Sequence, residues 1–222
     1  MTRLVRLRVP DRRAHARQQQ RAEILGAARR VLAEMGYDAA TLRDIIRRTS
    51  LRAATVHELF PDKESILRTL VDDTSRRLRT RVRAARDRAT SLEGFIGDAY
   101  LAFFSFLAED RVALELLRRE PATIRALLQE PTLMASVIEL REDLETAVAR
   151  GHLPRVDLEY LAAAMAGVAV EVALRMVERD PIDVQGAATF VTQLFLGGLD
   201  RLQAAPRSRG AGRSGRSGRR SR

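Results

Sequence analysis

The sequence predicts an all-α protein in which an N-terminal helix-turn-helix domain of three helices precedes a larger C-terminal helical domain. Three observations predict this class. Apolar residues recur at the i, i+3, i+4 and i+7 spacing of amphipathic helices along most of the chain. Residues that begin or end helices, such as Thr41, Asp62 and Gly36, separate these stretches. Segment 41–63 joins two short helical patterns by a tight turn, which is the plan of a helix-turn-helix.

Composition bounds the kind of protein. A chain of 222 residues can form one large or two small domains with a substantial core, and 45% hydrophobic with 31% charged residues indicates a globular, soluble protein. The absence of cysteine excludes disulfides, cysteine-based zinc sites and thiol nucleophiles. No apolar run reaches the roughly 18 residues of a membrane span, and residues 1–13 lack the apolar region of a signal peptide. We therefore expect a cytoplasmic protein.

The formal net charge of +10 is concentrated at the two ends of the chain. The first twenty residues hold six arginines and one aspartate, and residues 201–222 hold eight arginines and no acid, so the body between them is slightly acidic. Lys63 is the only lysine, and a GC-rich genome explains that ratio but not the clustering. Arginine-rich arms favour nucleic acid, because each phosphate contact releases counterions. A dispensable tail is the alternative interpretation of the N-terminal end.

The N-terminal third is predicted to hold the first three helices. Residues 1–17 are interpreted as a disordered basic arm, and the first helix is expected from Gln18 to the helix-ending Gly36. Thr41 and Asp44 form a capping-box pattern that begins the second helix. The third helix would bury three apolar residues and end before a proline, while its polar side faces solvent. The buried residues are Val56, Leu59 and Phe60, and the solvent side carries Arg52, Ala53, Ala54, Thr55, His57 and Glu58. Such a helix can enter a DNA major groove.

A fourth helix is expected from Asp62 to about Arg88, and the boundary between the two domains is placed within it. Its second half is rich in arginine on all sides. These arginines are interpreted either as a solvated surface or as a surface that attracts DNA.

The next segment, 92–108, holds most of the aromatic residues, which form either a plain core or the wall of a ligand cavity. Asp110 is expected to cap a short helix that ends before Pro121, and a further short helix is expected between residues 124 and 128. A clean apolar stripe then runs from Leu133 to Val148 and stops at Gly151. This pattern predicts a C-terminal domain built from helices of different lengths.

The last two helices are predicted at residues 157–179 and 183–203, before a disordered Arg/Ser/Gly-rich tail at 204–222. Both carry apolar stripes interspersed with alanine and glycine, which let helices approach closely. Two interpretations are open. The stripes either build a two-fold four-helix bundle between two copies of the chain or fill the core of one copy.

The N-terminal motifs resemble the DNA-binding domain of TetR-family (TetR/AcrR-like) transcriptional regulators. The resemblance rests on Gly36-Tyr37, Thr41-x-x-x-Ile45, Thr55 and Phe60-x-x-Lys63-Glu64, spread over roughly residues 22–70. It implies a helix-turn-helix domain at residues 18–68 and a ligand-binding and dimerisation domain at 69–203. Four positions depart from the family pattern. Ser50 stands where the family usually has Gly, and Arg52 stands where it has a Ser-like cap. His57 stands where Tyr is usual, and Leu59 stands where His is usual. Ser50 would be strained if its φ were positive.

By this resemblance one set of residues contacts an operator and another lines an effector site. Bases would be approached by Arg43, Arg52, Ala53, Ala54 and His57, and phosphates would be held by Thr41, Thr55, His57 and Lys63. The candidate effector residues are Phe95, Tyr100, Phe103, Phe104, Leu117, Met165, Ala169 and Val172. Their apolar and aromatic character predicts an apolar or aromatic molecule.

The sequence contains no recognisable motif for catalysis, for a cofactor or for a metal ion. The three histidines, His15, His57 and His152, lack metal-ligand spacing, and no phosphate-binding glycine motif or nucleophile elbow occurs. We therefore expect no enzyme activity, no cofactor and no metal. The leading hypothesis is a homodimeric, effector-released repressor that binds a palindromic operator. The alternatives are a sequence-nonspecific architectural DNA-binding protein that acts through its Arg-rich tails, and a helical enzyme or carrier of apolar molecules.

Overall fold

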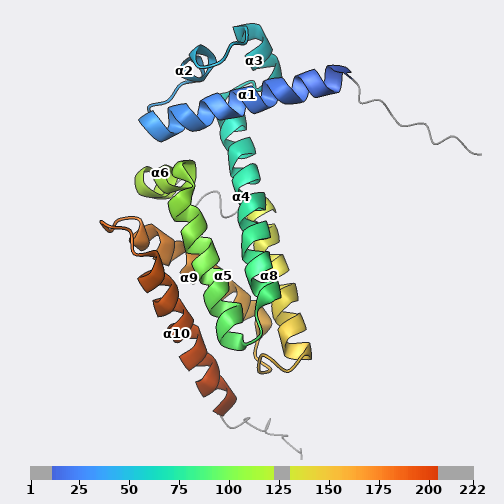
Figure 1. The fold of residues 1–222 in the computed structure, drawn as a ribbon, viewed down its shortest axis with the longest axis vertical. Coiled ribbons are helices and arrows are strands. Elements are labelled where there is room, and N and C mark those ends of the chain that lie inside the picture. Colours follow the sequence, from blue (N-terminus) through green and yellow to red (C-terminus); the bar gives the residue numbers. More distant parts are fainter. Residues whose placement is uncertain (1–11, 123–130, 205–222) are drawn as a thin grey trace, which may run out of the picture.

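The computed structural model describes residues 12–122 and 131–204, and the regular elements within them are all helices (Figure 1). This confirms the predicted all-α class. The N-terminal helices are α1 (Arg12–Met35), α2 (Leu42–Arg47), α3 (Ala53–Leu59) and α4 (Lys63–Arg88). The C-terminal helices are α5 (Leu92–Glu109), α6 (Arg111–Arg119), α8 (Pro131–Ala149), α9 (Leu158–Met176) and α10 (Val184–Ala204). The short helix expected at 124–128, the first part of the basic arm and the tail from residue 205 lie outside the described residues.

The N-terminal helices α1, α2 and α3 gather at one end of the molecule, and α4 runs from them along the remaining helices (Figure 1). One apolar cluster holds these helices together, and its side chains are buried because each short helix turns one face toward α1 and the start of α4. The cluster includes Ile24, Ala28, Val31, Ile45, Val56, Phe60, Ile66 and Leu70. The three residues predicted to form the buried face of the third helix, Val56, Leu59 and Phe60, are all buried.

The first helix begins earlier than the sequence predicts. α1 starts at Arg12 instead of Gln18, so residues 12–17 are helical and do not belong to a disordered arm. Arginine, alanine and glutamine are good helix formers, and no glycine or proline interrupts this stretch before Gly26. The side chain of Arg17 also contacts Glu58 of α3, which ties this first part of α1 to the domain.

Helix ends follow the predicted capping chemistry. The Thr41 hydroxyl accepts a hydrogen bond from the Asp44 N–H at 3.2 Å, and the Asp44 carboxylate accepts one from the Thr41 N–H at 3.1 Å, which completes the capping box. Gly36 ends α1 with a φ of +77°, a conformation that suits glycine. No described residue other than glycine has a positive φ, so Ser50 adopts the turn without that strain.

The C-terminal helices enclose a second apolar cluster, in which α5 packs between α4 and α10, while α8 and α9 pack against each other. Tyr100 lies at its centre and donates a hydrogen bond to the Met165 carbonyl oxygen at 3.0 Å. Burial raises the pKa of the Tyr100 hydroxyl well above its usual range, so it stays protonated as a donor. Its ring stacks on Phe104 and Phe195 at centroid distances of 5.9 and 6.0 Å.

Helix α6 lies within the predicted C-terminal domain of residues 69–203 and contributes side chains to both apolar clusters. Val112 and Leu116 are buried in the N-terminal cluster, while Ala113 and Leu117 are buried in the C-terminal cluster. A short amphipathic helix with apolar residues on two sides can join both cores, and α6 packs against α1 as well as α5. Helix α6 therefore connects the two clusters.

The apolar stripes of the last two helices mostly fill the core of a single chain. Leu161, Met165, Ala169 and Val191 are buried within it. A different face remains exposed. It carries Tyr160, Phe190, Leu194 and Leu202, each with more than half of its surface accessible to solvent.

Candidate DNA-binding surface and its attachment to the C-terminal domain

Helix α3 presents a polar face of short and medium side chains to solvent. Val56 and Leu59 point into the N-terminal core, which turns the opposite side of this seven-residue helix outward. Of the predicted contact residues, six are exposed and two, Thr55 and Lys63, are half-buried. The six exposed ones are Thr41, Arg43, Arg52, Ala53, Ala54 and His57. A face with small residues at its start lets the backbone approach base edges, and its polar side chains can form hydrogen bonds there.

The turn between α2 and α3 is held by carboxylates of α1. The Glu23 Oε1 accepts a hydrogen bond from the Ser50 backbone N–H at 2.6 Å, and this bond lowers the pKa of Glu23. Glu34 accepts two hydrogen bonds from the Arg48 guanidinium, at 3.1 and 2.7 Å, which lower the pKa of Glu34. Helix α1 therefore fixes the position of the turn, and with it the start of α3.

Two arginines of α1 fix the other end of α3. Arg21 donates to the Leu59 carbonyl oxygen at 3.2 Å, and its guanidinium lies 4.4 Å from the centre of the Phe60 ring. Arg17 lies 3.1 Å from a carboxylate oxygen of Glu58 on the exposed face of α3. Sequence reasoning missed both arginines, because a side chain that pairs with a residue about forty positions away leaves no local pattern.

Lys63, expected to hold a phosphate, already has partners within the protein. Its ammonium donates to the Tyr37 carbonyl oxygen at 2.8 Å and lies 4.2 Å from the centre of the Tyr37 ring. The Tyr37 hydroxyl donates to Glu64 at 3.2 Å, and its pKa is raised to about 12, first by burial and then by that hydrogen bond. The ammonium has three N–H groups, so these contacts orient Lys63 without using all of its donors.

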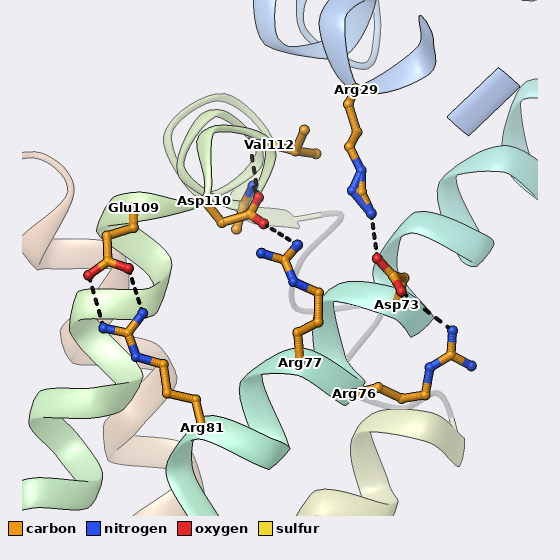
Figure 2. Close-up of polar contacts among 9 residues, drawn as sticks. Arg29, Asp73, Arg76, Arg77, Arg81, Glu109, Asp110 and Val112 are labelled. Atoms are coloured by element: carbon orange, nitrogen blue, oxygen red, sulfur yellow. Dashed lines mark hydrogen bonds and ion pairs between the residues drawn. The ribbon is translucent and has the colours of Figure 1, made fainter. Parts of the chain in front are cut away.

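Arg77 and Arg81 of α4 pair with acidic residues outside α4, and Asp73 of α4 pairs with an arginine of α1 (Figure 2). Asp73 accepts a hydrogen bond from Arg29 of α1 at 2.5 Å, and Arg76 lies 3.6 Å from the other oxygen of Asp73. Further along α4, Arg81 binds both carboxylate oxygens of Glu109, which lowers the pKa of Glu109. Neither sequence interpretation foresaw this arrangement. These arginines connect helices and are not simply a solvated or DNA-attracting surface.

The α5–α6 junction is joined to α4 through Asp110. One oxygen of Asp110 caps α6 by accepting from the Val112 and Ala113 N–H groups at 3.2 and 3.1 Å, as the sequence predicts. The other oxygen accepts from Arg77 at 3.1 Å (Figure 2). Because Val112 is buried in the N-terminal cluster, this junction links the C-terminal helices to the DNA-binding side of the molecule.

The eight candidate effector residues lie together in the C-terminal cluster. Five of them are buried and the other three pack against those five. The buried ones are Tyr100, Phe104, Leu117, Met165 and Ala169, and the partly buried ones are Phe95, Phe103 and Val172. Of this set only Phe95 lines a cavity of about 360 Å³ at the far end of α4. In the described residues these side chains form a packed core.

Two further features concern metal ions and membranes. Among residues 12–122 and 131–204, no group of three or more histidine or acidic side chains has the arrangement of a metal site. No described helix is both long and apolar enough to cross a membrane.

Comparison with known proteins extends the local resemblance to the whole fold. Residues 24–70 match the family model for bacterial regulatory proteins of the tetR family. The fatty acid degradation regulator FadR from Bacillus halodurans is similar over 81% of this chain and 96% of its own, with 26% identity and a TM-score of 0.68. A TetR-family transcriptional regulator from Pectobacterium atrosepticum is similar over 86% and 97%, with 21% identity and a TM-score of 0.69.

A third similar structure is the transcriptional regulator FadR from Bacillus subtilis in complex with stearoyl-CoA. It is similar over 80% of this chain and 98% of its own, with 21% identity and a TM-score of 0.67. The matched residues 24–70 contain all of α2 and α3, the second half of α1 and the start of α4, and the structural similarity continues through the C-terminal helices. Residues 24–70 thus match the DNA-binding part of the tetR family of bacterial regulatory proteins, and the chain is similar over most of its length to transcriptional regulators of that family.

Proposed function

We propose that this regulator is a repressor that binds a palindromic operator as a homodimer and is released by an apolar or aromatic small molecule. The observation that carries the proposal is the exposed face of α3, held in place by α1 while its apolar side is buried. A rigid helix of this kind can read base edges in the major groove. Two copies on one two-fold axis would place two such helices on successive turns of DNA.

Base contacts are assigned to Arg43, Arg52, Ala53, Ala54 and His57, and phosphate contacts to Thr41, Thr55, His57 and Lys63. An exposed arginine can bind the O6 and N7 atoms of guanine with both guanidinium nitrogens. His57 is exposed, and it replaces the usual tyrosine with a shorter ring that can still donate to a phosphate oxygen or a base edge. The departures at Ser50 and Leu59 leave the geometry of α3 intact, since Leu59 is buried in the core and the turn is unstrained.

The dimer surface is assigned to the exposed apolar face of α9 and α10. On α10, Phe190, Leu194, Gly198 and Leu202 follow one another at intervals of four residues and therefore lie along one side of the helix. A side chain added at Gly197 or Gly198 would meet no atom of the same chain within 4 Å. On α9, Tyr160 is 77% exposed. Large apolar residues beside small ones suit a close, self-complementary helix pair.

The effector is assigned to the C-terminal cluster around Tyr100 and Phe104. The stearoyl-CoA complex of a structurally similar regulator supports a ligand with a long apolar part. These side chains are packed, so a ligand would bind a conformer in which the helices separate, and its binding would shift the population toward that conformer. Helix α6 connects this cluster to α1, and the Arg77–Asp110 pair joins the start of α6 to α4. Both would carry such a shift toward α3.

Selection of bound sequences from a random DNA pool tests the proposal. The full chain is used at about 0.15 M salt, where nonspecific phosphate contacts are weakened. An enriched inverted repeat supports a dimeric, sequence-specific regulator. Binding without any enriched motif, lost as the salt concentration rises, contradicts the proposal and favours an architectural DNA-binding protein.

A further inference from the structure

A cavity of about 360 Å³ lies between the last turn of α4, the first turn of α5 and the end of α8. This is the end of the molecule opposite α2 and α3 (Figure 1). The volume falls within the range of about 300–1,000 Å³ in which small-molecule sites are found. Apart from Phe95, its walls use none of the residues assigned above to DNA, effector or dimer contacts.

Arg86 provides a buried positive charge at the wall of this cavity. Its side chain is only 9% exposed, and its Nη2 lies 2.9 Å from Asp143 Oδ2. The geometry of this contact is not that of a hydrogen bond, and the buried Nε of Arg86 has no hydrogen-bond partner among the described residues. A buried guanidinium with so few bonds is costly, because desolvation is repaid only when its five N–H groups are satisfied.

The remaining charged groups of the lining favour an anion in the cavity. Arg83 and Arg150 line it together with Arg86, against the two carboxylates of Asp87 and Asp143. Burial lowers the pKa of the Arg86 guanidinium, and its neighbours only partly oppose this effect. A second carboxylate near Arg86 and Arg150 would balance the excess of positive charge.

Part of the cavity lining is apolar. Leu92 and Phe95 of α5 contribute to it, with Ala147 of α8 beside them. Leu92 and Phe95 are each half-buried, which leaves part of their surface available for contact. A ligand that fits must therefore carry both an anionic group and an apolar body.

We propose that this cavity binds a small organic monocarboxylate, whose carboxylate pairs with Arg86 and Arg150 and whose apolar body rests on Leu92 and Phe95. The site is separate from the operator-binding surface and shares only Phe95 with the residues assigned to the effector. Its occupancy is measured on the protein without DNA, so it stands or fails independently of operator recognition.

Isothermal titration calorimetry of the full chain with benzoate tests the site, with benzamide as a neutral probe of the same shape. We expect saturable binding of one benzoate per chain and binding of benzamide that is weaker by about tenfold or more. Because substitution of the buried Arg86 risks unfolding, the charge is reversed at exposed Arg150. Arg150→Glu should weaken benzoate binding by about tenfold or more.

The matched control is Arg155→Glu, which makes the same charge change at an exposed arginine outside the cavity lining. It should bind benzoate as the wild type does. Three results would overturn the proposal. They are equal binding of benzoate and benzamide, equal losses in the two variants, and no saturable binding of benzoate, phenylacetate or hexanoate at millimolar concentration. The last result would leave Arg86 and Asp143 as a buried structural pair only.

Discussion

Arg77 of α4 donates a hydrogen bond to Asp110 across the α4–α5–α6 junction, with 3.1 Å between its Nη1 and the Oδ2 of Asp110 (Figure 2). The same carboxylate caps α6 through its other oxygen. Asp110 thus contacts both α4, through Arg77, and α6, whose N-terminus it caps. A change at this one residue should affect both.

Asp110→Ala should lower the free energy of unfolding by about 1–2 kcal/mol, because it removes a helix cap and leaves Arg77 without this partner. Asp110→Asn keeps an oxygen for the cap and should cost about half as much. Urea unfolding of both variants, with Arg77→Ala alongside, separates the two contributions. If Asp110→Asn and Asp110→Ala are equally destabilised, the helix cap does not make the larger contribution of Asp110 to the free energy of unfolding.

Arg21→Ala should destabilise the protein by about 1–2 kcal/mol, since it removes a hydrogen bond to the Leu59 carbonyl and a cation–π contact with Phe60. Arg21→Lys should not restore the loss, because a single ammonium cannot donate to the carbonyl and stack flat on the ring as a guanidinium does. Thermal or urea unfolding measures both. Full recovery in the lysine variant would show that only the charge matters.

Acid should weaken the attachment of α1 to the helix-turn-helix. The pKa values of Glu23 and Glu34 are lowered by hydrogen bonds from Ser50 and Arg48, so their stabilising contributions are present above the ordinary glutamate pKa of 4.5. They are lost as the pH falls through the lower pKa values of the folded state.

Glu34→Gln should therefore flatten the loss of stability between about pH 5 and pH 3. The measurement is the urea midpoint as a function of pH. Glu142→Gln, at an exposed glutamate of α8, controls for the change in net charge. An unchanged pH profile in Glu34→Gln would mean that the Arg48 pair does not stabilise the fold.

Phe190→Glu should convert the dimer to a monomer, because it places a charge on the exposed apolar face of α10. Ile138→Glu is the matched control, since Ile138 of α8 is 57% exposed and Phe190 is 60% exposed. Sedimentation velocity should show a dimer for the wild type and the control and a monomer for Phe190→Glu. A dimer in all three would place the interface elsewhere.

Arg43→Ala should weaken operator binding by about 1–3 kcal/mol and relax the preference at one base pair of each half-site. His57→Ala should weaken binding more uniformly across sequences if His57 contacts phosphate. Fluorescence anisotropy with matched and scrambled duplexes distinguishes the two. Arg141→Ala, at an exposed arginine of α8, should leave binding unchanged. Equal affinity of Arg43→Ala and wild type for the operator would remove Arg43 from the contact set.

The parts of the fold that depend on local chemistry could be predicted from the sequence. The capping pair Thr41–Asp44, the cap at Asp110 and the glycine at the end of α1 all act within a few residues, so their signals are readable in the chain. The buried face of α3 follows from helical spacing alone. The early start of α1 was missed because a disordered arm and a polar helix have similar compositions.

The parts that depend on which helix packs against which could not be predicted in the same way. Val112 and Leu116 follow an ordinary helical stripe, and only the tertiary fold assigns them to the N-terminal core. The stripes of α9 and α10 had two possible partners, and the structure buries most of them within one chain. In the sequence, Arg86 cannot be distinguished from the other arginines of its helix. Only the structure shows that its side chain is buried.

The most direct test of the central claim compares binding to the complete inverted repeat with binding to a single half-site, at about 0.15 M salt. If two copies of α3 read one palindrome, the wild type should prefer the complete site by more than about tenfold, and Phe190→Glu should bind both duplexes alike. Equal affinity of the wild type for the complete site and the half-site would contradict a dimeric, operator-specific regulator.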